Sequence, residues 1–134
     1  MRILIDADTY IALYNKDDAL HNKANKILNS LKNKDVETFT TYDVVDEVAT
    51  KLSYFLKKSD SLRFLKQLME SETEIIYPTE NSLLETIEKV KSIRSKRVSF
   101  TDCANMIAYK HYDIDAIFSF DKIYEKQGIK TLKP

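Results

Sequence analysis

The sequence contains very few of the residues that break regular secondary structure. Its 134 residues include one glycine, two prolines and no tryptophan. Long irregular loops are therefore not expected, and helices are favoured. With 43% hydrophobic and 10% aromatic residues, the chain can bury a core of its own. We expect a single domain over residues 1–134 rather than a disordered protein.

The chain also lacks the features of secreted and membrane proteins. Its single cysteine, Cys103, cannot form an internal disulfide, which favours a reducing compartment. It has no apolar run of the roughly 20 residues that a transmembrane helix requires, and its first residues do not resemble a signal peptide. We therefore expect a cytoplasmic protein that does not enter a membrane.

Charge is balanced, with 21 basic and 21 acidic residues, so net charge does not favour nucleic-acid binding. One local run differs, because the segment KVKSIRSKR, from Lys89 to Arg97, holds basic residues and no acid. A solvated helix end explains such a run, since basic side chains favour a helix C-terminus. A contact with the phosphate groups of a nucleic acid explains it as well.

Short apolar segments alternate with helical patterns along the chain. The spacing of apolar residues predicts helices over about 18–33, 44–56, 62–69, 83–90 and 101–111. Short apolar runs predict strands over 2–5, 36–41, 74–78, 115–120 and 129–132. This alternation indicates an α/β fold with a central, mostly parallel sheet of about five short strands flanked by helices.

Acidic residues lie at the ends of several of these elements. Asp6 follows the first predicted strand, Asp102 starts a predicted helix, and Asp121 follows the fourth strand. Glu47 lies in the first turns of the helix over 44–56. Because the carboxyl ends of parallel strands meet at one edge of a sheet, these carboxylates are expected to converge. Like charges at close range need protons, basic partners or a cation, and oxygen ligands suit Mg²⁺ or Mn²⁺.

Three of these acids also have an interpretation that involves no metal. Ser99 and Asp102 fit the pattern of a capping box, and Asp121 can cap a short helix that follows it. Glu47 lies well away from the apolar stripe of its helix, as a solvated residue does. Helical periodicity does not separate Glu47 from its neighbour Asp46.

The run ILIDADTY at residues 3–10 raises a different function. Its apolar strand ends on the pair Asp6 and Asp8, and phosphatases of the haloacid dehalogenase type place two such aspartates after a strand, the first as nucleophile. Their motif requires threonine at the place that Tyr10 occupies here. A phosphatase that uses Asp6 is therefore an alternative with its threonine out of register. The sequence has neither a glycine-rich phosphate loop nor a nucleophile elbow.

Three segments of the sequence carry a resemblance to a known family. They are ILIDADTYIALYNKDDALHNKA, TTYDVVDEVATKL and SFTDCANMIAYKHYDIDAIFSFDKIYEKQGIKTL. Together they resemble the PIN-domain ribonucleases, and especially the VapC-like toxins of type II toxin–antitoxin pairs. The last segment is the most specific, because it holds a helix-opening aspartate, an apolar strand, a second aspartate and a glycine in the family's order.

The resemblance implies an endoribonuclease that depends on Mg²⁺ or Mn²⁺. By position, Asp6, Glu47 and Asp102 bind the metal, and Asp121 completes the acidic site. The resemblance favours Glu47 over Asp46. Asp8 departs from the family pattern, because it stands near a place where a small hydroxyl or amide residue is common; it either adds a carboxylate to the site or points away from it.

The resemblance also implies partners. The substrate is RNA, and the basic residues expected to hold its backbone are Lys51, Arg94, Lys96 and Arg97. A toxin of this kind is inhibited by a small antitoxin protein and forms a homodimer, for which the predicted helices over 44–55 and 62–69 offer a face. The third interpretation is a non-catalytic PIN module that binds RNA or protein.

Overall fold

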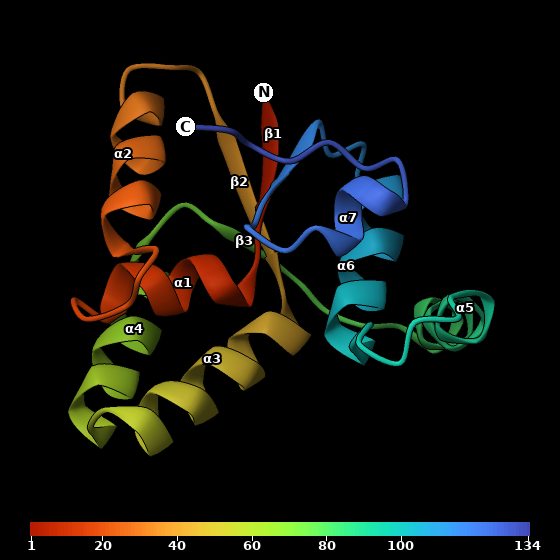
Figure 1. Cartoon of the computed structure of the whole chain (residues 1–134), viewed down its shortest axis with the longest axis horizontal. Coiled ribbons are helices and arrows are strands. Elements are labelled where there is room, and N and C mark those ends of the chain that lie inside the picture. The colour runs from red at the N-terminus through yellow and green to blue at the C-terminus, as the bar shows by residue number, and fades with distance from the viewer.

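A parallel sheet of four strands forms the middle of the molecule in the computed structural model, which describes all residues from 1 to 134 (Figure 1). The strands are β1 (Arg2–Ile5), β2 (Glu37–Thr41), β3 (Glu74–Ile76) and β4 (Ala116–Phe118). Their order is β3-β2-β1-β4, and every pair is parallel. β1 therefore lies inside the sheet, where Ile3 is opposite Thr38 on one side and Ala116 on the other.

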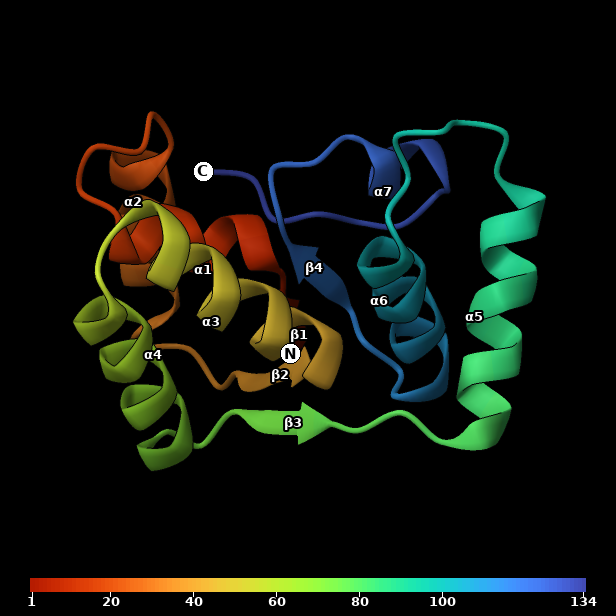
Figure 2. The same ribbon diagram turned by 90° about the horizontal axis from the view of Figure 1, so that it is seen from below.

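Seven helices lie on the two sides of this sheet. Four lie on one side (Figures 1 and 2): α1 (Ala7–Tyr14), α2 (His21–Leu31), α3 (Tyr42–Phe55) and α4 (Lys58–Glu70). The other side carries α5 (Glu80–Ser92), α6 (Phe100–His111) and α7 (Ile123–Lys126). The predicted α/β fold is confirmed. None of the helices combines the length and the apolar character needed to cross a membrane.

Alternation along the buried strands divides the core into two. Successive side chains of a strand point to opposite faces of the sheet. Ile3 and Ile5 pack in the core beneath α1, α3 and α4, which also contains Phe64. Leu4, between them in the sequence, packs in the second core beneath α6 and α7, which also contains Tyr124. Both faces of β1 are therefore buried, as the unbroken apolar run of this strand indicates.

The predicted strand over 129–132 is reduced to one parallel bridge, between Ile117 and Thr131. The backbone N–H of Ile117 donates to Lys130 O at 2.9 Å, and that of Leu132 donates to Ile117 O at 3.1 Å. This segment is therefore not a strand, and the sheet has four strands rather than about five. The C-terminal segment still covers the outer edge of β4, which leaves fewer unpaired backbone groups there.

Some helices bury other side chains than the apolar stripes in the sequence predicted. The predicted stripes included Phe55, Leu62 and Met69, but these side chains are 78%, 56% and 71% exposed. Phe64 is fully buried instead, where its ring meets the rings of Tyr10 and Tyr14 edge to face. The pattern predicted no helix over α1, because α1 packs against the sheet, α2 and α3 and so buries residues on more than one side.

Phe64→Ala is expected to reduce the free energy of unfolding by about 3–5 kcal/mol, because it removes a fully buried ring from the first core. The measurement is urea unfolding followed by circular dichroism. The control is Leu84→Ala, which truncates a side chain that is 55% exposed on α5, and it should change the free energy by less than about 0.5 kcal/mol. Equal losses for the two variants would contradict this assignment of the core.

Candidate active site

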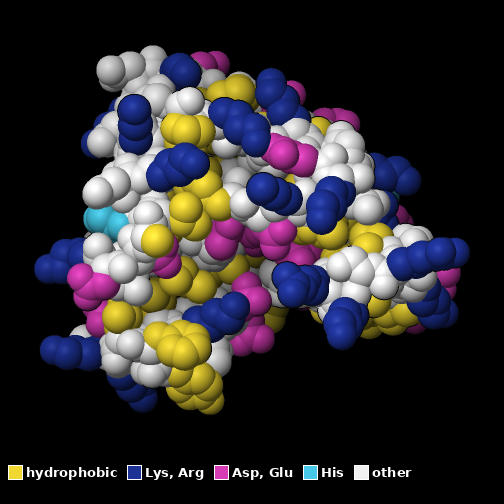
Figure 3. Space-filling view, viewed as in Figure 1, with side chains coloured by type: hydrophobic (Ala, Val, Ile, Leu, Met, Phe, Trp, Pro, Cys, Tyr) yellow, Lys and Arg dark blue, Asp and Glu magenta, His cyan; other side chains and the backbone are white.

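A cavity of about 330 Å³ lies where β1 and β4 end, and most of its lining is charged. Its acidic residues are Asp6, Asp8, Asp18, Glu47, Asp102 and Asp121, and its basic residues are Lys51 and Arg97. The four acids selected from the sequence therefore line one cavity. Figure 3 shows acidic side chains near the middle of this face, with Lys and Arg side chains around them.

Asp6 is the innermost of these acids, and its carboxylate is held by three hydrogen bonds. Its Oδ1 accepts from the backbone N–H of Ala7 at 2.7 Å and from Asn105 Nδ2 at 2.9 Å. Its Oδ2 accepts from the Tyr124 hydroxyl at 2.8 Å. Asp6 is also the N-cap of α1, so the turn from strand to helix fixes its position.

Asp102 has a structural role and a place in the cavity at the same time. The capping box expected from the sequence is present: the Asp102 N–H donates to Ser99 Oγ, and the Ser99 N–H donates to Asp102 Oδ2 at 2.8 Å. This cap uses Oδ2. The other oxygen, Oδ1, lies 3.3 Å from the Tyr124 hydroxyl, which also contacts Asp6.

Glu47 and Asp121 lie nearer the opening. Glu47 has 28% of its side chain exposed, and its Oε1 lies 3.4 Å from Lys51 Nζ, one helical turn further on. Asp46 is exposed and does not line the cavity, so the geometry separates two residues that periodicity did not. Asp121 is exposed, and its Oδ1 accepts from the Ile123 N–H at 2.9 Å, which supports the start of α7.

Asp8 lines the cavity, yet its carboxylate is bound to the segment after β4. Its Oδ2 accepts from the Phe120 N–H at 2.8 Å and from Ser119 Oγ at 3.1 Å. Ser119 Oγ in turn accepts from the Asp121 N–H at 3.1 Å. Asp8 therefore ties α1 to the chain that carries Asp121. Asp18, which the sequence did not single out, adds a carboxylate from the loop before α2.

The residues that hold the carboxylates were missed by the sequence analysis. Tyr124 and Asn105 are fully buried, and Thr41 donates from its hydroxyl to Asn105 Oδ1 at 2.8 Å. The ring of Tyr124 packs in the second core, and no local sequence pattern marks its hydroxyl as part of a site. Asn105 could have been found from the sequence, because it is an amide among the apolar residues of α6. A buried amide needs hydrogen-bond partners.

Burial and mutual repulsion disfavour ionisation of the inner acids. Burial raises the pKa of Asp6 to about 7, and the charges of Asp8 and Asp102 add to this rise. Burial also raises the pKa of Asp8. A cation in the cavity would oppose both effects, since a nearby positive charge favours the ionised form.

The chemistry of this lining fits a hard divalent cation. All of its ionisable acceptors are carboxylates, with no cysteine and no histidine, which is the ligand set of Mg²⁺ and Mn²⁺. No group of three or more Asp, Glu, His or Cys side chains is already gathered closely enough to hold an ion. We therefore expect that an ion would draw the less buried carboxylates toward the inner ones as it binds.

Solved structures of VapC toxins match the chain over nearly its whole length. VapC20 of Mycobacterium tuberculosis, a sarcin-ricin loop cleaving toxin, matches with a TM-score of 0.90 and 19% identity, over 98% of this chain and 99% of that one. The chain has the fold of the VapC toxins. VapBC2 of Rickettsia felis, bound to a promoter DNA fragment, matches with a TM-score of 0.72 and 14% identity, over 98% of both chains.

FitAcB of Neisseria gonorrhoeae shares the VapC fold as well, with a TM-score of 0.68 and 15% identity, over 98% of this chain and 97% of that one. No family model and no curated protein matches the sequence. The fold implied by the resemblance is therefore confirmed, and at these identities the likeness concerns the fold.

The basic residues expected to bind RNA divide into two pairs on this VapC fold. Lys51 and Arg97 line the acidic cavity. Arg94 and Lys96 are exposed in the loop between α5 and α6 and do not line it. α5 ends at Ser92, so only the first part of the basic run is a helix end.

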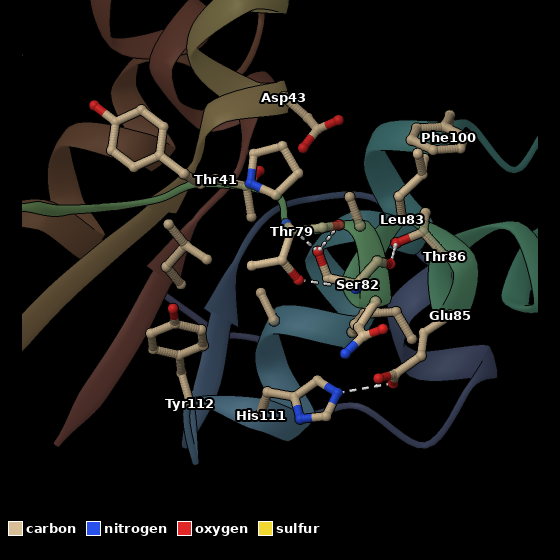
Figure 4. A pocket seen from close by; sticks show the side chains of 17 residues that line it. Thr41, Asp43, Thr79, Ser82, Leu83, Glu85, Thr86, Phe100, His111 and Tyr112 are labelled. Atoms are coloured by element: carbon tan, nitrogen blue, oxygen red, sulfur yellow. Dashed lines mark hydrogen bonds and ion pairs between the residues drawn. The ribbon is translucent and has the colours of Figure 1, made fainter.

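A second cavity, of about 320 Å³, lies between α5 and α6 and contains no comparable gathering of acids (Figure 4). Its acidic residues are Asp43 and Glu85, and His111 also lines it. Glu85 is already paired with His111, whose Nε2 lies 2.7 Å from Glu85 Oε2. The acidic cavity is therefore the candidate site of this VapC fold.

The metal-free protein is expected to lose stability as the pH rises from about 4 to about 7. The pKa of Asp6 in the folded protein, about 7, lies above its ordinary value of 3.8. The folded state therefore binds this proton more tightly than the unfolded state. This contribution to stability is fully present below the pKa of Asp6 in the unfolded state. It is lost as the pH rises through the pKa of Asp6 in the folded state.

The measurement is urea unfolding in a chelating buffer at several pH values. Asp6→Asn cannot ionise, so its stability should depend less on pH than that of the native protein. Asp46→Asn, the control, removes an exposed acid from α3 and should keep the native slope. An equally steep slope in Asp6→Asn would show that Asp6 is not the group responsible.

Proposed function

We propose that this protein is a metal-dependent endoribonuclease that hydrolyses phosphodiester bonds of RNA, and that it is the toxin of a toxin–antitoxin pair. The observation that carries the proposal is the cavity in which a VapC fold brings Asp6, Glu47, Asp102 and Asp121 together. No two of these four acids are neighbours in the sequence, and four different segments supply them. Their convergence therefore depends on the fold.

The four acids are the ligands of Mg²⁺ or Mn²⁺ in this proposal. When bound, such a cation lowers the pKa of water and stabilises charge on a phosphate. Asp6 and Asp102 hold their carboxylates in fixed positions, because backbone and buried side-chain donors bind them. Glu47 and Asp121, which are less buried, face the side from which RNA and the attacking water enter. Water attacks phosphorus in line, and the bond from phosphorus to the leaving oxygen breaks.

The basic residues position the RNA backbone beside these acids. Arg97 and Lys51 lie at the cavity itself, and Arg94 and Lys96 extend the basic surface along the loop before α6. Contacts of this kind bind phosphate and carry no sequence information. Because the net charge of the chain is zero, RNA binding should be weak and sensitive to salt.

We also infer a small antitoxin partner and a homodimer. The likeness to VapBC2 of Rickettsia felis, whose structure was solved with a promoter DNA fragment, supports the proposal of an antitoxin partner. Apolar side chains are exposed on the two helices expected to form the dimer: Tyr54, Phe55, Leu62 and Met69. A contact between two copies would cover such side chains. As a nuclease for cellular RNA, the protein would act in the cytoplasm.

The alternative of a phosphatase gains no support from the site. Tyr10 occupies the place where the phosphatase motif requires threonine, and its side chain is buried in the first core. The Thr9 hydroxyl donates to Phe118 O at 2.8 Å and serves the packing of α1. A non-catalytic module is excluded if the protein shows RNA cleavage that depends on Mg²⁺ or Mn²⁺.

Glu47→Gln is expected to lower kcat/KM for RNA cleavage by about 100-fold or more, because it removes a carboxylate ligand from the cavity. The matched control is Asp46→Asn, which changes the preceding residue of α3 outside the cavity and should leave cleavage unchanged. The measurement is cleavage of a mixed RNA pool with Mn²⁺, with and without a chelator. Cleavage that survives the chelator would refute metal dependence.

Arg97→Gln is expected to raise KM several-fold while kcat changes little, because it removes a phosphate contact beside the acids. The dependence of log KM on log salt should also decrease by about one unit of slope. Lys96→Gln should act in the same direction. Lys32→Gln, at the exposed end of α2, is the control. An unchanged KM in Arg97→Gln would count against an RNA contact at this residue.

A further inference from the structure

The Tyr124 hydroxyl lies between two carboxylates that the sequence places far apart. It donates to Asp6 Oδ2 at 2.8 Å and lies 3.3 Å from Asp102 Oδ1. Asn105 Nδ2 donates to the same hydroxyl oxygen at 2.9 Å. Asp6 follows β1, Asp102 lies in the first turn of α6, and Tyr124 belongs to α7, so one hydroxyl links three parts of the fold.

The tyrosine is held rigidly. Tyr124 is fully buried, and its ring packs in the second core with Leu4 and Ile117. The Asn105 amide is fixed in turn by the Thr41 hydroxyl, which donates to Asn105 Oδ1 at 2.8 Å. The hydroxyl therefore has a fixed place and a fixed direction, because Asn105 donates to its oxygen and leaves its hydrogen for the carboxylates.

The hydrogen bonds determine which carboxylate oxygens can accept a cation. A carboxylate oxygen has two lone pairs. Asp6 Oδ1 uses both, for Ala7 and Asn105, whereas Oδ2 uses one, for Tyr124. Asp102 Oδ2 accepts from the Ser99 N–H, and its Oδ1 shares the one hydrogen of the Tyr124 hydroxyl at the longer distance of 3.3 Å. Oδ2 of Asp6 and both oxygens of Asp102 thus keep a lone pair for a ligand in the cavity.

We propose that Tyr124 is a positioning residue, which holds the Asp6 and Asp102 carboxylates as a preformed pair for a divalent cation. This inference rests on the proposed function, since it concerns the same acidic site. A neutral hydroxyl is suited to the task, because it fixes both groups without cancelling the charge that a cation needs. Removing an outer hydrogen-bond partner of a metal ligand typically weakens metal affinity by about 10-fold to 100-fold.

The test is Tyr124→Phe, which removes the hydroxyl and keeps the ring. Mn²⁺ affinity is measured by isothermal titration calorimetry without RNA, and cleavage is measured at several Mn²⁺ concentrations. The dissociation constant for Mn²⁺ should rise about tenfold or more. Cleavage at low Mn²⁺ should fall, and saturating Mn²⁺ should restore most of it, with KM for RNA unchanged.

Tyr10→Phe is the matched control, because Tyr10 is a buried tyrosine on the other side of the sheet whose hydroxyl has no hydrogen-bond partner. It should leave Mn²⁺ affinity unchanged. Asn105→Leu is a second variant, which keeps the tyrosine but removes the amide that donates to its hydroxyl and to Asp6 Oδ1. It should also weaken Mn²⁺ affinity, and an unchanged affinity in this variant overturns the positioning role if Tyr124→Phe does not fold.

The outcomes distinguish this inference from the proposed function. If the native protein binds Mn²⁺ and cleaves RNA, and Tyr124→Phe binds Mn²⁺ equally well, the positioning role is overturned and the nuclease stands. If the native protein binds Mn²⁺ without cleaving RNA, the nuclease fails, and the loss of affinity in Tyr124→Phe still supports the positioning role. A native protein that does not bind Mn²⁺ overturns both.

Discussion

A carboxylate buried at the end of the first strand is the constraint on which the rest of this structure depends. Asp6 is only 4% exposed, and a charge removed from water is tolerated only when hydrogen bonds replace the lost solvent. Its three donors are Ala7 in α1, Asn105 in α6 and Tyr124 in α7. These helices must close around β1 before Asp6 can be buried, so the site and the fold form together.

Much of the fold was predictable because its signals are local. The apolar run of β1 and the stripes of the longer helices follow from burial, and their alternation indicates a parallel sheet. Two features were not predictable in this way. α1 has no single apolar face, since it packs between the sheet and other helices. The segment over 129–132 forms one bridge, at Thr131, instead of a strand. Its pairing requires a partner in β4, which has only three residues, and the sequence of 129–132 carries no information on that partner.

The sequence could identify a site residue only where its position at the end of a strand or helix indicated a role. Asp6 and Asp102 lie at element ends, and the structure shows that Asp102 both caps α6 and lines the cavity. Choosing Glu47 over Asp46 required a resemblance or a structure, because both lie off the apolar stripe. The role of the Tyr124 hydroxyl depends on contacts across 118 residues of sequence to Asp6, for which no local pattern exists.

Neutral hydrogen-bond donors, rather than opposite charges, hold the carboxylates of Asp6 and Asp102, so their negative charge is not cancelled. Neither Asp6 nor Asp102 forms an ion pair, whereas Lys51 pairs with Glu47 at the more exposed side of the cavity. A buried lysine would cancel the charge of Asp6 and compete with a cation. An amide and a hydroxyl fix the carboxylates and leave their charge in place. The cost is a raised pKa and a less stable metal-free protein, which the two apolar cores on either side of β1 must offset.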